Sequence, residues 1–77
     1  MNNSQQMLEA LEQQDLPKAD SYFQKAIEED SDEVLLELAA YLEGIGFYPQ
    51  AAQIYEKLAP KFPEVYINLA AIAGEDG

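Results

Sequence analysis

The chain contains no cysteine and no histidine, and its only basic residues are four lysines. Without cysteine it can form no disulfide and can offer no thiolate as a nucleophile. Without histidine it lacks the commonest metal ligand and the side chain that most often transfers protons near neutral pH. Gly44-Ile45-Gly46 is not followed by a lysine, so it is no phosphate-binding loop. We therefore expect no enzyme, no cofactor and no metal ion in this chain.

Positive charge is scarce, because fifteen acidic residues stand against four basic ones and the net charge is −11 at pH 7. Such a surface repels the phosphates of nucleic acids and the anionic headgroups of membranes. The first residues lack the basic start and apolar segment of a secretory signal, and no apolar run is long enough to span a membrane. These features predict a cytoplasmic protein that binds neither nucleic acid nor membrane, whereas a basic protein partner is compatible with its charge.

The spacing of the apolar residues predicts an all-α fold. These residues recur every three or four positions, and no stretch sustains the strict alternation that is typical of a strand. Pro17 and Pro49 each suit the first turn of a helix, where the missing N–H costs nothing, and Gly44 and Gly46 suit a helix end. Five helices are expected, at about residues 4–14, 17–29, 32–43, 49–59 and 65–73, and GEDG is expected to end the last one.

Helical periodicity also predicts the residues that face inward and the caps that start the third helix. Asp30 and Ser31 both suit its N-terminus, and Asp30 has capping-box spacing with Glu33. The inward positions expected in the first four helices are Met7, Leu8, Leu11, Ala19, Phe23, Ala26, Ile27, Leu35, Leu38, Ala39, Leu42, Ala51, Tyr55 and Leu58.

Parts of the chain repeat each other. Ala19 and Ala51 lie 32 positions apart, each follows a proline by two residues, and each precedes an aromatic residue, Phe23 or Tyr55, by four. The third and fifth expected helices match each other at a shift of 34. An internal period of this size is typical of helical repeat arrays.

The central repeat resembles a tetratricopeptide repeat. Its residues follow the pattern of that family in the order Leu35-x2-Leu38-Ala39-x2-Leu42, then Ala51-x3-Tyr55, then Pro63. The resemblance implies antiparallel helical hairpins stacked as a right-handed solenoid, here the N-terminal part of a bacterial-type repeat array. Within one domain over 1–77 it implies a degenerate first repeat at 1–31, a complete repeat at 32–65 and the first helix of a third repeat at 66–77. The first repeat fits this scheme with an inner loop one residue shorter, if Leu11 corresponds to Leu42.

The tetratricopeptide resemblance also implies a concave groove, lined by the first helix of each hairpin. With small apolar residues on its floor and acidic residues at its edges, the groove would bind a basic peptide that carries an apolar anchor. It has no basic residue, which argues against the family members that clamp the C-terminal carboxylate of chaperones. The expected function is therefore a protein-interaction scaffold. The groove positions are Gln5, Glu9, Glu12, Glu33, Leu36, Ala40, Glu43, Ile67 and Ala70.

The last expected helix has no following helix to cover one side of it, on which Val65, Ile67, Leu69 and Ile72 are expected. Two explanations are open: either the chain is part of a longer array, which we favour, or this face forms a homodimer. A third alternative is a non-catalytic regulatory part of a larger protein.

The acidic run at 28–33 has two explanations, a cation site or ordinary helix ends. No loop here alternates acids around a central glycine, as a calcium loop would. Helix ends and caps therefore explain the run better, although Glu28 and Glu29 oppose the helix dipole.

Overall fold

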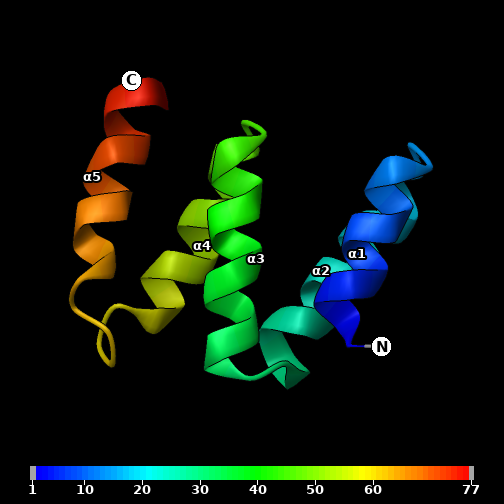
Figure 1. The fold of residues 1–77 in the computed structure, drawn as a ribbon, viewed down its shortest axis with the longest axis horizontal. Helices are drawn as coiled ribbons and strands as arrows, with labels where there is room; N and C mark the ends of the chain where they lie inside the picture. Colours follow the sequence, from blue (N-terminus) through cyan, green and yellow to red (C-terminus); the bar gives the residue numbers. More distant parts are fainter. Residues whose placement is uncertain (1, 77) are drawn as a thin grey trace. The chain divides into compact units, whose positions relative to one another are not determined.

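The structure, a computed structural model, describes the backbone of residues 2–76 and the side chains of residues 2–74. Residues 2–76 form five helices and no strand, which confirms the all-α prediction (Figure 1). They divide into two compact units, Met1–Leu35 (unit 1) and Leu36–Gly77 (unit 2), and the division falls within α3. The helices are α1 (Asn3–Glu12), α2 (Leu16–Glu29), α3 (Asp32–Gly44), α4 (Tyr48–Leu58) and α5 (Val65–Asp76).

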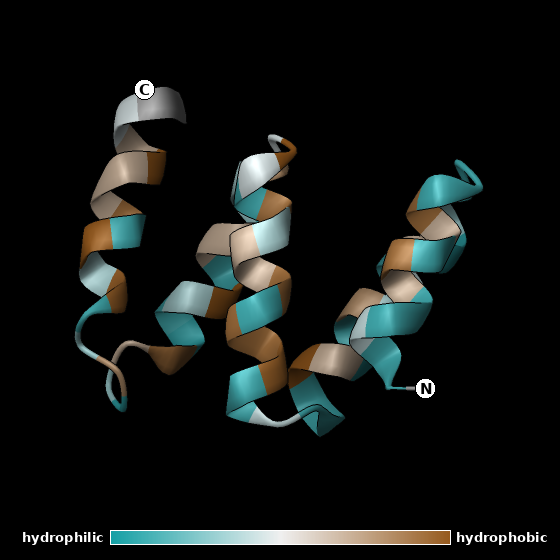
Figure 2. Cartoon of the chain, viewed as in Figure 1, coloured by the Kyte–Doolittle hydropathy of each residue, from teal (hydrophilic) through white to brown (hydrophobic). Residues whose placement is uncertain are grey.

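Hydropathy alternates along the helices, and apolar bands lie between hydrophilic ones (Figure 2). This is the pattern of helices that bury one stripe and expose the rest. Of the helices in residues 2–76, none has both the length and the apolar character to cross a bilayer.

Unit 1 is an antiparallel helix pair. α1 packs against α2, and the first residues of α1 hydrogen-bond to Asp30, which directly follows α2. Phe23 is the largest buried side chain of the unit, and burying such a residue stabilises the fold by about 1.5–3 kcal/mol. The apolar interior of the pair, at most 2% exposed, consists of Met7, Ala10, Ala19, Phe23 and Ala26.

The inward face of α1 differs from the prediction. Met7 is buried as expected, but Leu8 and Leu11 are only half-buried, and Ala10 is buried instead. Ser4, Met7 and Ala10 are three positions apart and therefore form one stripe along the helix. The pattern of large apolar residues missed this stripe, because alanine and serine contribute little to it.

Unit 2 contains the C-terminal part of α3, with α4 and α5. In Figure 1, α3 and α5 run in the same direction and α4 runs back between them, packed against α5. All the positions expected to face inward in this unit are buried, together with Ile54 and Ala59, which the pattern did not select. The buried residues are Leu38, Ala39, Leu42, Ala51, Ile54, Tyr55, Leu58, Ala59, Val65 and Ile72.

The last helix continues further than predicted. GEDG does not end it, since α5 continues through Gly74 to Asp76. An added Cβ at Gly74 would meet nothing within 4 Å, and its backbone is not left-handed. A glycine in a helix costs about 1 kcal/mol relative to alanine, which weakens a helix but need not stop it.

The turns after α1 and α3 are the same structure. Each helix ends in a Schellman motif, in which a residue in the left-handed region follows the C-cap: Gln14 at φ 59° and Gly46 at φ 88°. The amide of Asp15 donates to the carbonyl of Ala10 at 2.9 Å. After α3, the amide of Phe47 donates to the carbonyl of Leu42 at 2.8 Å.

The matching turns correct the expected register of the first repeat. Three residues separate α1 from α2, and three separate α3 from α4. Leu42 therefore corresponds to Ala10 at a shift of 32, and not to Leu11. The prediction of an inner loop one residue shorter is wrong, because it compared two leucines that face different directions.

The caps of α1 and α3 are local. The Asn2 side chain accepts from the amide of Gln5 at 2.8 Å, and the amide of Asn2 donates to the side-chain oxygen of Gln5 at 3.1 Å, which completes a capping box. The Ser31 hydroxyl accepts from the amide of Val34 at 3.3 Å, as expected for the cap of α3. The Asp30 carboxylate, however, is directed to the start of α1.

Candidate functional site

Glu43 joins the three helices of unit 2. It lies one residue before the end of α3, and its Oε1 accepts a hydrogen bond from the hydroxyl of Tyr55, on α4, at 3.1 Å. The same oxygen accepts a second bond from Nδ2 of Asn68, on α5, at 3.4 Å. The second bond is long and contributes less than the first. One carboxylate oxygen thus positions side chains from two other helices.

Tyr55 stays protonated in this arrangement. Burial, the hydrogen bond to Glu43 and the charge of Glu43 together raise the pKa of Tyr55 to about 12. Its hydroxyl therefore keeps its proton at physiological pH and is the donor of the hydrogen bond.

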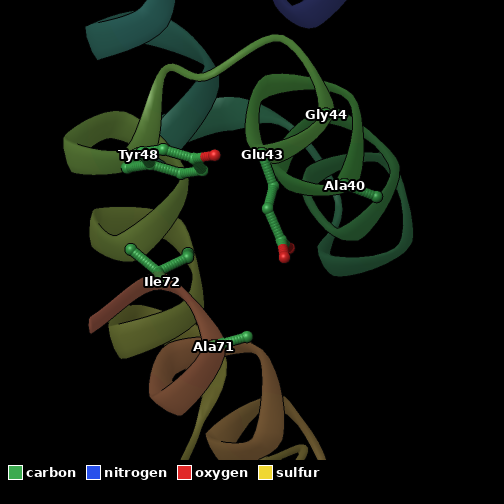
Figure 3. A pocket seen from close by; sticks show the side chains of 6 residues that line it. All are labelled: Ala40, Glu43, Gly44, Tyr48, Ala71 and Ile72. Atoms are coloured by element: carbon green, nitrogen blue, oxygen red, sulfur yellow. The ribbon is translucent and has the colours of Figure 1, made fainter. Parts of the chain in front are cut away.

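A hollow of about 530 Å³ opens beside Glu43. Figure 3 shows the Glu43 side chain extending into the space that Ala71 and Ile72 border on one side and Ala40 on the other. The small residues of the lining leave room, and the ring of Tyr48 forms another wall (Figure 3). Among the side chains of residues 2–74, those that line the hollow are Ala40, Glu43, Gly44, Tyr48, Ala71 and Ile72, and Glu43 alone of these is charged.

The predicted groove positions of unit 2 coincide with this hollow in part. Ala40 and Glu43 line it. Leu36 is half-buried one turn before Ala40, outside the lining. Ile67 and Ala70 are exposed, and the residues of α5 that line the hollow are Ala71 and Ile72.

Sequence reasoning missed four lining residues of the hollow: Gly44, Tyr48, Ala71 and Ile72. Gly44 and Tyr48 stand at the end of α3 and the start of α4, outside the first-helix positions that the repeat pattern selects. The one available signal was the helical spacing of Ala40, Glu43 and Gly44, which places them on one side of α3.

The remaining predicted groove positions belong to unit 1, where all are exposed. Gln5, Glu9 and Glu12 follow one another at spacings of four and three and so share one face of α1. Glu33 lies in the first turn of α3, where its charge suits the helix dipole.

The self-association face expected on α5 is not one exposed surface. Val65 and Ile72 are buried within the chain and Leu69 is half-buried, whereas Ile67 is 76% exposed. Residues 65, 69 and 72 share a stripe at helical spacing, and residue 67 lies about 200° round the helix from residue 65. The large apolar side chains that are exposed on this helix are Tyr66 and Ile67.

The acidic run at 28–33 contributes a structural clasp in unit 1. Oδ2 of Asp30 accepts from the amide and the hydroxyl of Ser4, at 2.8 and 2.7 Å, and Oδ1 accepts from the amide and side chain of Asn3, at 3.3 and 3.1 Å. Glu29 accepts a further bond from Asn3 at 3.3 Å. Asp30 thus satisfies amides at the positive end of α1 that have no partner within the helix.

The clasp favours the charged form of Asp30. Partial burial alone would raise its pKa, but the hydrogen bonds from Ser4 and Asn3 outweigh burial and lower the pKa below its ordinary value of 3.8. Among the side chains that the structure describes, no three acidic groups are arranged to hold a metal ion.

Comparison of the chain with family models, curated proteins and solved structures found no match.

Proposed function

We propose that this chain is a tetratricopeptide-like interaction module that docks a peptide segment of a partner protein in the hollow of unit 2. The observation that carries the proposal is the hollow itself, about 530 Å³ in volume, with small side chains around a partly buried glutamate. Sites for small ligands and side chains are typically about 300–1,000 Å³ in volume, with apolar walls and a few polar groups.

The repeat architecture is supported by the two matching turns. Each follows a helix with a Schellman motif, spans three residues and leads into a helix with proline at its second position. The alanine, aromatic and small or apolar positions of α2 and α4 then coincide at one shift of 32, and all six residues are buried. Helical repeats of this kind stack into extended binding surfaces.

The chemistry of the hollow favours a basic segment. The described residues of its lining carry one negative charge and no positive charge, within a chain whose net charge is −11. Such a field attracts basic partners and disfavours acidic ones. The walls formed by Tyr48 and Ile72 suit an apolar residue next to the basic one.

The proposal is tested with a synthetic library of peptides of about ten residues, screened against the whole chain. Peptides that bind are then measured with Ala40→Arg, which fills the hollow and offsets the charge of Glu43, and with Gln53→Arg, which adds the same charge at an exposed position on α4. We expect Ala40→Arg to weaken binding at least about tenfold, which is about 1.4 kcal/mol, and Gln53→Arg to change it little. No selective binding to the parent chain, or equal affinity for both variants, would refute the proposal.

Self-association is a second candidate function, and the exposed pair on α5 favours it. Tyr66 and Ile67 are 59% and 76% exposed. Large apolar side chains next to each other on a surface are often an interface. Sedimentation should then show dimers that Ile67→Glu converts to monomers. A mass that matches the monomer at all concentrations would exclude this candidate.

A further inference from the structure

We propose that the Glu43 hollow recognises one basic side chain of the docked segment, an arginine in preference to a lysine. This inference rests on the proposed function, because it assigns the chemistry of the same hollow. Three properties of unit 2 support it: an acid that the turn does not require, donors that hold the acid in place, and walls that suit a flat cation.

The first property, that the turn does not require the acid, follows from the corresponding positions in unit 1. At the shift of 32, Glu43 corresponds to Leu11 and Tyr55 to Phe23. The turn after α1 has the same length and the same Schellman hydrogen bonds, with Leu11 and Phe23 in place of the carboxylate and the phenol. A helical hairpin of this type therefore forms with an apolar pair at these positions. Glu43 and Tyr55 add a charge and its hydrogen bond where the backbone needs neither.

The second property is that two neutral groups orient Glu43. The hydroxyl of Tyr55 and the amide of Asn68 both donate to its Oε1, at 3.1 and 3.4 Å, and both groups are uncharged. Groups held in position by neighbouring hydrogen bonds lose less entropy when a ligand binds. Neither donor brings a positive charge to Glu43, so its carboxylate can still pair with a cation in the hollow.

The third property is the composition of the walls. Ala40, Gly44 and Ala71 are small and leave space beside the carboxylate, and the Tyr48 ring closes another side (Figure 3). An aromatic face attracts a cation. A guanidinium can lie flat against a ring and still donate to a carboxylate, whereas an ammonium is a compact and more strongly hydrated charge. Arginine therefore fits this lining better than lysine does.

The test uses a single amino acid as its probe and so needs no known partner. Nα-acetyl-arginine-N-methylamide is titrated into the whole chain, and the methyl signals of Ala40, Ala71 and Ile72 are followed by NMR. The citrulline counterpart has nearly the same shape without the charge, and the lysine counterpart has the charge without the planar group. We expect saturable shifts with arginine, weaker binding by severalfold with lysine, and at least about tenfold weaker binding with citrulline.

Protein variants sharpen the test. Glu43→Gln should lower the affinity for the arginine probe at least about tenfold, and Glu37→Gln, an exposed position on the same helix, should leave it unchanged. Equal binding of the arginine and citrulline probes, or equal loss in both variants, would overturn the inference. If Glu43→Gln disturbs the fold of unit 2, the comparison of the two probes on the parent chain still decides.

Failure of the inference and failure of the proposed function give different results. If library peptides bind the hollow with no preference for arginine, the docking function stands and the arginine site is wrong. If the arginine probe binds in a Glu43-dependent way but no peptide binds selectively, the site stands and the docking function is wrong.

Discussion

The turns after α1 and α3 have the same backbone but achieve it with different residues. Gln14 occupies the left-handed position after α1, where Gly46 stands after α3. Asp15 then caps α2 through its side chain, whereas Phe47, at the same position before α4, provides no side-chain cap. Each turn thus combines one favourable residue with one unfavourable residue. The same turn geometry can therefore be stabilised either by a glycine at the left-handed position or by a side-chain cap at the residue that follows it.

The interiors of the two hairpins differ in polarity. Phe23 is buried in unit 1, and at the corresponding position of unit 2 the Tyr55 hydroxyl donates to Glu43. The polar side of unit 1 lies instead at the other end of its helices, where Asp30 binds the start of α1. At the position that corresponds to Asp30, unit 2 has Phe62, which is half-buried. Each unit therefore places its polar contacts where the other has apolar residues.

The largest expected effect on stability comes from introducing at Phe23 the hydroxyl that Tyr55 has at the corresponding position of unit 2. Phe23→Tyr places a phenol opposite Leu11, where no acceptor corresponds to Glu43, and an unsatisfied buried hydroxyl should cost about 2–3 kcal/mol. Urea unfolding followed by circular dichroism measures this loss. Adding Leu11→Glu should recover about 1 kcal/mol in a double-mutant cycle. Additive losses would show that positions 11 and 23 do not correspond to 43 and 55.

The next largest effect should come from removing the clasp of unit 1. Asp30→Ala removes four hydrogen bonds to Asn3 and Ser4, and we expect the free energy of unfolding to fall by about 2 kcal/mol. Hydrogen exchange at the Ser4 amide should become faster. Asp20→Ala, at an exposed position on α2, is the matched control and should change stability by about 0.5 kcal/mol or less. An equal loss in both variants would mean that the clasp contributes nothing.

A smaller effect, of opposite sign in the two turns, is expected when their left-handed residues are exchanged. Gln14→Gly should stabilise the chain by about 1 kcal/mol, because glycine adopts a positive φ without strain. Gly46→Gln should destabilise it by about 1 kcal/mol through backbone strain alone, since a Cβ there would meet no atom within 4 Å. Thermal unfolding of both variants measures these shifts. Shifts of the same sign would show that the turns are not equivalent.

The smallest effect is confined to alkaline pH. The pKa of Tyr55 is raised from 10.0 to about 12, so its contribution to stability is fully present below pH 10 and is lost as the pH rises through 12. Absorbance titration should show one tyrosine ionising near pH 12, and this step should be missing in Tyr55→Phe. Tyr66→Phe, at an exposed position, should retain it. In Glu43→Gln the step should move to lower pH.

Much of the helical structure could be predicted because its signals are local. The spacing of Phe23 and Ala26 marks an inward stripe, and Pro17 and Pro49 mark helix starts, whatever the rest of the chain does. The cap at Ser31 was predictable for the same reason. The burial of Ala10 was not predictable, because alanine contributes little to the apolar pattern and its burial depends on how the neighbouring large side chains are oriented.

The candidate site was predictable in part. Ala40 and Glu43 share a face of α3 at helical spacing, which sequence reasoning identified. Ala71 and Ile72, in place of Ala70, depend on the rotation of α5 against α4, and a single helix does not reveal that rotation. The partners of Glu43 lie 12 and 25 residues away along the chain, so no local pattern indicates them.

The sequence by itself determined the five helices, most of their inward stripes and the period of 32, since each depends on residues within a few turns of one another. Only the tertiary structure decided that Asp30 binds the start of α1, that the two turns have equal length, and that a hollow opens beside Glu43. The physical reason is that these features depend on side chains that packing brings together from different helices, and a one-residue change of register or rotation would pair different groups.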